Sequence, residues 1–222
     1  MKPNQLFSSV FATLFVFGCG ITDASAQLAS RKASEWVGVL ESPSRVAGQK
    51  VGEVLARLSL TPGMAVADIG AGSGLFTRAI AKIVAPTGTV FAVDIQQDLL
   101  DYINRRDEQE QIQNVKTVLG EFDDPSLPSR DIDLALINDV LHHIENRAAY
   151  LKTLGTYMKQ SGRIAIIEMN KDDPDTPHRD QPELLLSRQD IDQWMSAAGF
   201  EPVQEFPDLF PGTRWFLVYG RK

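Results

Sequence analysis

The sequence has 222 residues, with 22 lysines and arginines, 29 aspartates and glutamates, three histidines and one cysteine, and its formal net charge is −7. This length suits one α/β domain or two small ones, and 43% hydrophobic with 23% charged residues excludes a wholly disordered chain. The acidic balance argues against a nucleic-acid-binding surface, and a single cysteine excludes an internal disulfide and a cysteine-based zinc site.

The first 26 residues have the pattern of a secretory leader. Residues 3–22 carry no charge, and the small residues Ala-Ser-Ala at 24–26 precede a cleavage point. A basic start, an apolar centre and an A-x-A site are typical of a signal peptide, so we predict export to a periplasmic or extracellular location. An uncleaved membrane anchor over residues 3–22 and a lipoprotein with lipid on Cys19 stay open as alternatives. Membrane contact is expected only through such a leader.

Helix and strand patterns alternate through the rest of the chain. Residues 27–60 have a helical period and predict an N-terminal helical cap, followed by one domain over residues 61–222. Strands are predicted at residues 64–69, 89–94, 115–119, 132–138, 163–168, 201–206 and 215–219. Helices are predicted at residues 75–84, 97–112, 145–159 and 188–198, the last capped by Ser187 and ended by Gly199.

This alternation predicts an α/β fold with a Rossmann-like, doubly wound, mostly parallel sheet of seven strands. The last two strands are joined by a short connection, which suits an antiparallel pair because a parallel pair needs a long crossover. Ser161 and Gly162 predict a turn before the fifth strand, and the polar, proline-rich residues 170–182 predict a loop over one edge.

A glycine-rich segment, Asp68-Ile69-Gly70-Ala71-Gly72-Ser73-Gly74, lies between the first predicted strand and the following helix. Open α/β sheets bind ligands at this edge, where glycines allow a close backbone approach. The spacing G-x-G-x-G is one residue shorter than the dinucleotide fingerprint, which favours a nucleoside ligand without a pyrophosphate. Twenty residues after Gly74, Asp94 ends the second strand and can accept hydrogen bonds from both ribose hydroxyls.

Together these segments resemble the class I S-adenosylmethionine-dependent methyltransferases, of the type 11-like group. Residues 66–74 resemble the first motif of that family, residues 93–95 the second, residues 120–124 its adenine-side loop, and residues 138–144 the segment after the fourth strand. The resemblance extends over about residues 45–221 and implies S-adenosyl-L-methionine as the cofactor. It carries little information about the methyl acceptor.

The resemblance also implies which residues bind the cofactor. They are Asp68, Gly70, Ala71, Gly72, Ser73 and Gly74 at its methionine end, Asp94 and Ile95 at the ribose, Glu121, Phe122 and Asp123 beside the adenine, and Asn138 and Asp139 near the sulfonium. Because the cofactor carries an activated methyl group, the task left to the protein is to position a nucleophile in line with it.

His142 and His143 follow the fourth predicted strand and are the candidate catalytic residues, as a general base for the acceptor. The alternative is that one histidine packs and the other caps a turn. Glu168 ends the fifth strand and either faces the substrate or only contacts solvent in a loop. We expect the acceptor pocket to be built by residues 27–50 and 170–190.

Residue types and motifs that the chain lacks exclude several classes of methyl acceptor. Without the leader there is no cysteine, hence no thiolate for cytosine C5 methylation or arsenite methylation. Residues 138–141 lack the Asn/Asp-Pro-Pro-aromatic motif of amino methyltransferases. We therefore expect a small-molecule acceptor methylated on O, N or C, no nucleic acid and no metal, with no prediction of oligomeric state. A non-catalytic nucleoside-binding module and a nicotinamide-dependent oxidoreductase are the alternative functions.

Overall fold

The computed structural model describes residues 32–176 and 179–222. The predicted leader, with its uncharged run 3–22 and Cys19, lies outside these residues, so cleavage, lipidation and export stay predictions. In the described part of the chain, no helix has the length and apolar character needed to cross a bilayer.

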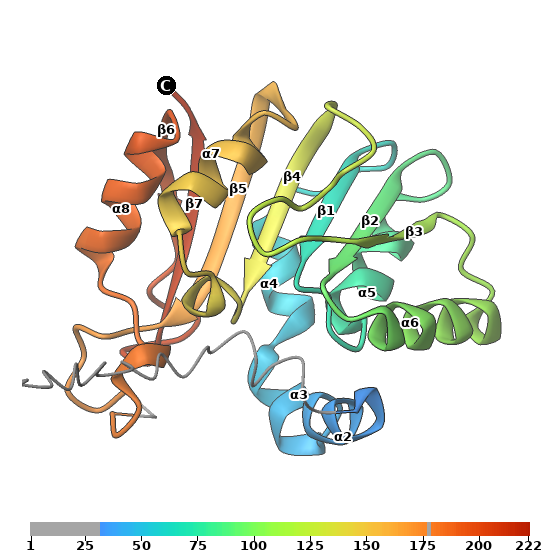
Figure 1. The fold of residues 1–222 in the computed structure, drawn as a ribbon, viewed down its shortest axis with the longest axis horizontal. Helices are drawn as coiled ribbons and strands as arrows, with labels where there is room; N and C mark the ends of the chain where they lie inside the picture. The colour runs from blue at the N-terminus through green and yellow to red at the C-terminus, as the bar shows by residue number, and fades with distance from the viewer. Residues whose placement is uncertain (1–31, 177–178) are drawn as a thin grey trace, which may run out of the picture.

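A seven-stranded sheet forms the centre of the described chain (Figure 1). Its strands are β1 (Ala65–Ile69), β2 (Thr89–Asp94), β3 (Val115–Leu119), β4 (Ile132–Asn138), β5 (Met158–Met169), β6 (Phe200–Glu205) and β7 (Arg214–Arg221). Their spatial order is β3-β2-β1-β4-β5-β7-β6. The strands β1 to β5 run parallel, and β7 is antiparallel to both of its neighbours. The predicted Rossmann-like, mostly parallel sheet with an antiparallel last strand is confirmed.

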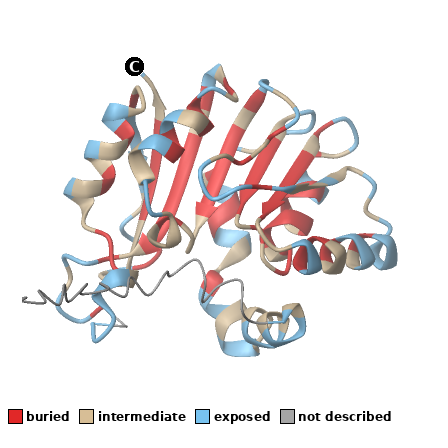
Figure 2. Cartoon of the chain, in the orientation of Figure 1, coloured by how far each residue is buried: buried red, intermediate tan, exposed pale blue. Residues whose placement is uncertain are grey.

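Helices cover both faces of the sheet. The helices are α2 (Ala33–Leu40), α3 (Pro43–Gln49), α4 (Val51–Arg57), α5 (Leu75–Val84), α6 (Gln97–Glu110), α7 (Arg147–Gly155) and α8 (Arg188–Ala197), with short 3-10 turns η1 (Leu141–His143) and η2 (Pro182–Leu184). Helices α7 and α8 pack on one face, whereas α4 and α5 pack on the other. The central strands are therefore buried on both sides (Figure 2) and read as continuous apolar runs.

The chain turns at Ser161 and Gly162 as predicted, since a Cβ on Gly162 would lie 2.9 Å from the carbonyl oxygen of Lys159. The turn lies within the bounds of β5, however, and not before that strand. The pairing of β5 with β4 shifts register between Ile132 and Leu134, where residues 159–162 of β5 have no partner on β4. Gly162 permits this close approach, since a Cβ there would lie 2.8 Å from the carbonyl oxygen of Ile132. The glycine thus serves a tight turn that interrupts the pairing of a strand.

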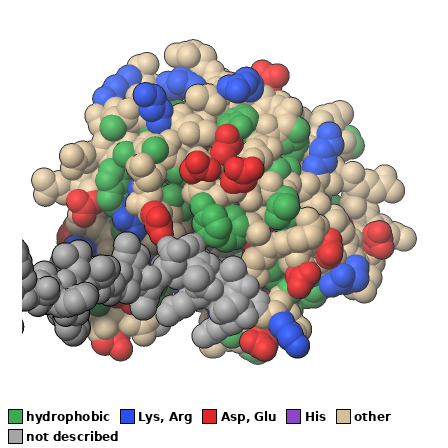
Figure 3. Space-filling model, in the orientation of Figure 1, with side chains coloured by type: hydrophobic (Ala, Val, Ile, Leu, Met, Phe, Trp, Pro, Cys, Tyr) green, Lys and Arg blue, Asp and Glu red, His purple; other side chains and the backbone are tan. Residues whose placement is uncertain are grey.

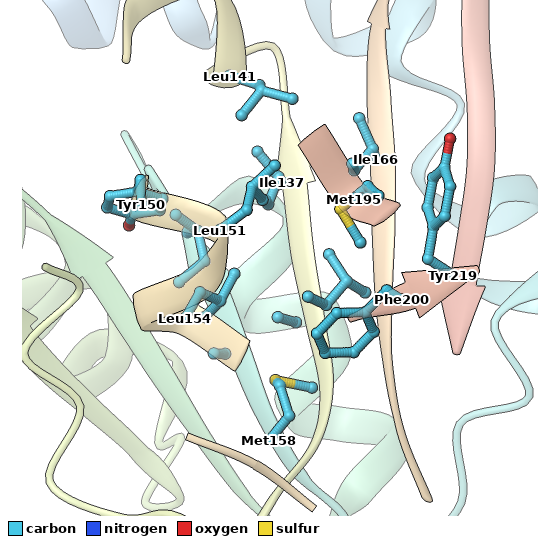
Figure 4. Packing of buried hydrophobic residues seen from close by; sticks show 14 of the residues in the cluster. Ile137, Leu141, Tyr150, Leu151, Leu154, Met158, Ile166, Met195, Phe200 and Tyr219 are labelled. Atoms are coloured by element: carbon cyan, nitrogen blue, oxygen red, sulfur yellow. The ribbon is translucent and has the colours of Figure 1, made fainter. Parts of the chain in front are cut away.

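The core under α7 and α8 is closed by Phe200, at the start of β6 (Figure 4). The side chain is fully buried, and a Cβ on Gly155 of α7 would come within 3.0 Å of its Cε2. The aromatic ring thus fills the space left where α7 has no side chain.

We expect Phe200→Ala to lower the free energy of unfolding by about 3–5 kcal/mol, since it removes a buried ring and leaves a cavity. Urea unfolding measures the change as a lower midpoint with an unchanged slope. Val203→Ala, on the same strand but 49% exposed, is the control and should change stability by less than about 0.5 kcal/mol. Equal losses in both variants would contradict the role of the ring in the core.

Candidate functional site

The predicted site residues meet where the strand order reverses. The chain passes from β1 to β2 on one side and from the neighbouring β4 to β5 on the other. The crevice at the carboxyl ends of two such strands is the usual ligand position of open α/β sheets. A main cavity of about 180 Å³ and an adjoining smaller one of about 80 Å³ lie there. Figure 3 shows hydrophobic side chains next to acidic ones near the middle of the visible face.

The predicted cofactor residues are distributed over these cavities. The main cavity is lined by Gly70, Gly72, Asp94, Ile95, Glu121, Phe122 and Asp139. The smaller cavity is lined by Asp68, Gly70, Ala71, Gly72, Ser73, Asn138 and Asp139. Asp123 lines a separate surface hollow beside Glu121 and Phe122, and Gly74 serves as the N-cap of α5.

The glycine loop is shaped by close contact with the segment after β4. Gly70 has a φ of +69°, a conformation that L side chains rarely adopt. A Cβ at this position would overlap Cγ2 of Val140. The loop therefore presents bare backbone to the crevice, which is the cradle that a nucleoside ligand needs.

Asp94 is held at the end of β2 by backbone donors. Its carboxylate accepts hydrogen bonds from the N–H groups of Gly72 at 2.9 Å and Gln96 at 3.0 Å, and the residue is 8% exposed. Burial raises the pKa of Asp94, and these backbone donors act against that rise. The carboxylate thus ties the glycine loop to the next strand while it lines the main cavity.

Asp68 lies beneath the glycine loop. Its carboxylate accepts a hydrogen bond from the hydroxyl of Thr77 at 2.6 Å. Burial raises the pKa of Asp68 to about 6, and the nearby Asp94 adds to the rise. The ionised form of Asp68 is therefore unfavourable at this position, as expected of a site arranged for a cationic ligand group.

Two buried acceptors between the cavities have no protein partner within the described residues. They are Oδ1 of Asn138 and Oδ1 of Asp139. The other Asp139 oxygen pairs with Arg45 at 3.1 Å and Arg214 at 3.5 Å, and Asp139 itself has a φ of +60°. Unpaired buried acceptors usually mark a missing partner. The ammonium group of S-adenosylmethionine could donate to them and its sulfonium could add a favourable positive charge, so these residues fit that cofactor.

A cap formed by α2 and α3 closes the crevice from outside the sheet. Trp36, Leu40 and Arg45 line the main cavity. Glu41, between the two helices, bonds Arg78 at 3.3 Å, Arg106 at 3.3 Å and the hydroxyl of Tyr102 at 2.9 Å. Residues 27–50, expected to build the acceptor pocket, thus contribute to the lining through their described part, 32–50. No described residue of 170–190, the other expected segment, lines either cavity.

The two candidate catalytic histidines occupy different depths. His143 lines the main cavity, whereas His142 lies behind it, with Nε2 of the two rings 3.0 Å apart. Nδ1 of His142 is 2.7 Å from Glu168, whose side chain is fully buried. The sequence did not reveal that Glu168 turns inward, because a strand-end acid has the same pattern in either orientation.

The surroundings shift the pKa values of the two histidines in opposite directions. Burial lowers the pKa of His142, but the hydrogen bond and charge of Glu168 outweigh it, with help from Asp139, so the net pKa is raised. Burial and the neighbouring His142 lower the pKa of His143 to about 4. His143 is therefore neutral near pH 7, as a proton acceptor must be.

One described group of three side chains has metal-ligand composition. Atoms of Asp139, His142 and Glu168 lie within 4.8 Å of one another. Both Glu168 oxygens already accept hydrogen bonds, and Asp139 is paired with two arginines. Cations beside a ligand set oppose metal binding, so we propose no metal here.

Comparisons with known proteins agree with this geometry. Residues 60–199 match the family described as a methyltransferase domain. A ubiquinone/menaquinone biosynthesis C-methyltransferase, UbiE, of Burkholderia vietnamiensis is 28% identical over 117 residues, 53% of this chain and 48% of that protein. A demethylmenaquinone methyltransferase of Geobacillus sp. is 23% identical over 119 residues, 54% of this chain and 51% of that protein. The chain thus spans about half the length of these curated relatives.

Among solved structures, a SAM-dependent methyltransferase from Aquifex aeolicus superposes with a TM-score of 0.74 at 23% identity, over 85% of this chain and 98% of that chain. At this identity the similarity concerns the fold.

Asp68→Asn keeps an acceptor for Thr77 and removes the costly charge. An unfolded aspartate titrates near 3.9, and the folded pKa is about 6, so the unfolded state loses its proton first and wild-type stability falls as pH rises across that window. We expect the variant to gain about 2–3 kcal/mol relative to wild type between pH 4 and 6.5. Urea unfolding at several pH values measures this. Asp131→Asn, at an exposed position, controls for the substitution itself.

A stability difference between Asp68→Asn and wild type that is constant over this pH range would contradict our inference that the buried, ionised Asp68 lowers the stability of the wild type.

Proposed function

The chain belongs to the methyltransferase-domain family, the class I S-adenosylmethionine-dependent enzymes that its motifs resemble, and we propose that it methylates a small, largely apolar molecule. The observation that carries this proposal is the crevice at the strand reversal. It combines a bare glycine loop, a buried carboxylate on Asp94 and unpaired acceptors on Asn138 and Asp139.

Each part of this crevice suits one part of the cofactor. Asp94 can accept from the ribose hydroxyls, the backbone at Gly70 and Gly72 can approach the methionine end, and Phe122 can cover the adenine. The unpaired oxygens of Asn138 and Asp139 suit the positively charged part of the cofactor. When bound, S-adenosylmethionine supplies a methyl group made electrophilic by the positive sulfur.

The rest of the main cavity supports an apolar acceptor. Trp36, Leu40, Val140 and Ile144 line it together with His143. Relatives named as quinone-biosynthesis C-methyltransferases favour carbon as the acceptor atom. A ring carbon becomes nucleophilic when an adjacent hydroxyl loses its proton, and His143 is the described basic group on this wall that is neutral near pH 7.

We expect Asp94→Ala to weaken binding of S-adenosylmethionine and S-adenosylhomocysteine by about 1.5–3 kcal/mol, because it removes a charged hydrogen-bond acceptor. This is a loss of about ten- to hundredfold in affinity, measured by titration calorimetry. Asp131→Ala, at an exposed position, should bind as the wild type does. Absence of binding by the wild type would overturn the proposed function.

His143→Ala should leave cofactor affinity within about twofold of wild type and lower methyl transfer by about 10²–10⁴-fold, the usual contribution of a general base. Transfer of labelled methyl groups to small-molecule extracts of the native host measures turnover, and calorimetry with S-adenosylhomocysteine measures affinity. Unchanged turnover would remove His143 from this role.

A further inference from the structure

Glu168 accepts hydrogen bonds from the segment that follows β4. It is fully buried, and Oε1 accepts from the backbone N–H groups of Val140, at 2.9 Å, and Leu141. Its other oxygen, Oε2, lies 2.7 Å from Nδ1 of His142. Both oxygens thus act as hydrogen-bond acceptors, and an acceptor oxygen needs a hydrogen on the atom that faces it. Nδ1 of His142 therefore carries a hydrogen.

The hydrogen on Nδ1 of His142 determines where the other ring hydrogens lie once both rings are neutral, that is, above the raised pKa of His142. A neutral histidine has one N–H and one lone pair, so a proton on Nδ1 of His142 leaves its Nε2 as an acceptor. Nε2 of His143 lies 3.0 Å away and must then donate to it. Nδ1 of His143 is consequently left with a lone pair. His143 lines the main cavity, and its Nδ1 has no protein partner in the described residues.

We propose that Glu168, His142 and His143 form a proton relay in which Glu168 sets the tautomer of both rings and thereby makes Nδ1 of His143 the proton acceptor of the cavity. Glu168 and His142 are positioning residues, and His143 is the group that meets the acceptor. The relay deepens the proposed function and rests on it for the identity of the proton donor, but the tautomers are a property of this chain alone.

The proton balance of the relay explains why a base with a low pKa can work. The acceptor hydroxyl gives its proton to Nδ1 of His143, and the bonding electron pair stays on the acceptor. The hydrogen on Nε2 of His143 moves to Nε2 of His142. The positive charge thus ends on His142, beside the Glu168 carboxylate, where it is stabilised.

Charged groups from each neighbouring element act on His142. Glu168 of β5 and Asp139 after β4 favour the charged ring, whereas Arg147 of α7 opposes it. Arg147 also holds η1 in place, donating to the carbonyl oxygens of Leu141 and His142 at 3.0 and 2.7 Å. Since the net pKa of His142 is raised, the pair takes up one proton above the ordinary histidine pKa of about 6.5. Methyl transfer should decline as pH falls through that point.

Glu168→Gln tests the relay because it should invert both tautomers. The amide oxygen keeps accepting from Val140 and Leu141, so its NH₂ group faces Nδ1 of His142 and donates to it. His142 must then carry its hydrogen on Nε2, and His143 must carry its hydrogen on Nδ1. The cavity would face a donor in place of an acceptor, and methyl transfer should fall by about 10²–10⁴-fold.

Proton–nitrogen correlation NMR of nitrogen-labelled protein reads the tautomers directly, and the chain has only three histidines to assign. At a pH well above the raised pKa of His142 we expect Nε2–H on His143 in the wild type and Nδ1–H in Glu168→Gln. Glu201→Gln, at an exposed position on β6, should keep the wild-type pattern. Calorimetry with S-adenosylhomocysteine on the same samples should show unchanged affinity.

The outcomes separate the two proposals. Nδ1–H on His143 in the wild type at that pH, or the same tautomers in wild type and Glu168→Gln, would overturn the relay whether or not the variant is active. The wild-type spectrum alone gives this answer even if the variant fails to fold. Loss of cofactor binding in the wild type would overturn the proposed function and leave the tautomer result standing.

Discussion

Burial of carboxylates at the carboxyl ends of the strands is the constraint on which the site depends. Asp68, Asp94 and Glu168 end or nearly end β1, β2 and β5, and all three are less than 9% exposed. A buried carboxylate is tolerable only when donors surround it, so each one recruits them from neighbouring segments. Asp94 draws in the N–H groups of Gly72 and Gln96, and Glu168 draws in those after β4. The loops take their shape from these bonds.

The same bonds connect the two halves of the crevice. Glu168 fixes the backbone at Val140, and the side chain of Val140 occupies the space where Gly70 has no Cβ. The glycine loop that faces the cofactor and the turn that carries the histidines are thus packed against each other. A change at either segment is felt at the other, because protein interiors are close-packed.

The cap is held differently from the sheet. Helix α2 contains no fully buried residue and α3 contains one, Gln49, so little apolar area secures them. Their attachment comes from Glu41, from the pair between Arg45 and Asp139, and from the hydrogen bonds that Gln49 accepts from Asn138 and Arg214. Partly exposed ion pairs contribute little stability. An element secured in this way opens at lower cost than the core, which suits the entry of ligands into a crevice that the cap covers.

Local patterns in the sequence located most elements. Three strands, 89–94, 115–119 and 132–138, and the helix 75–84 have the bounds predicted for them, because apolar runs, glycines and prolines act through short-range physics. The turn at Gly162 was predicted as well, but not that β5 begins before it at Met158, since that pairing depends on the neighbouring strand β4. The segments at the crevice were found from the glycine spacing and the position of Asp94.

By itself, the sequence determined the fold class and the cofactor edge of the sheet, because periodicity, glycine spacing and strand-end acids depend only on neighbours along the chain. The tertiary structure alone decided which of two adjacent histidines meets the cavity, that Glu168 turns inward behind them, and that Glu41 ties the cap to α5 and α6. These relations join residues 26 to 65 positions apart. No local pattern specifies the donors that long-range packing brings to a buried charge.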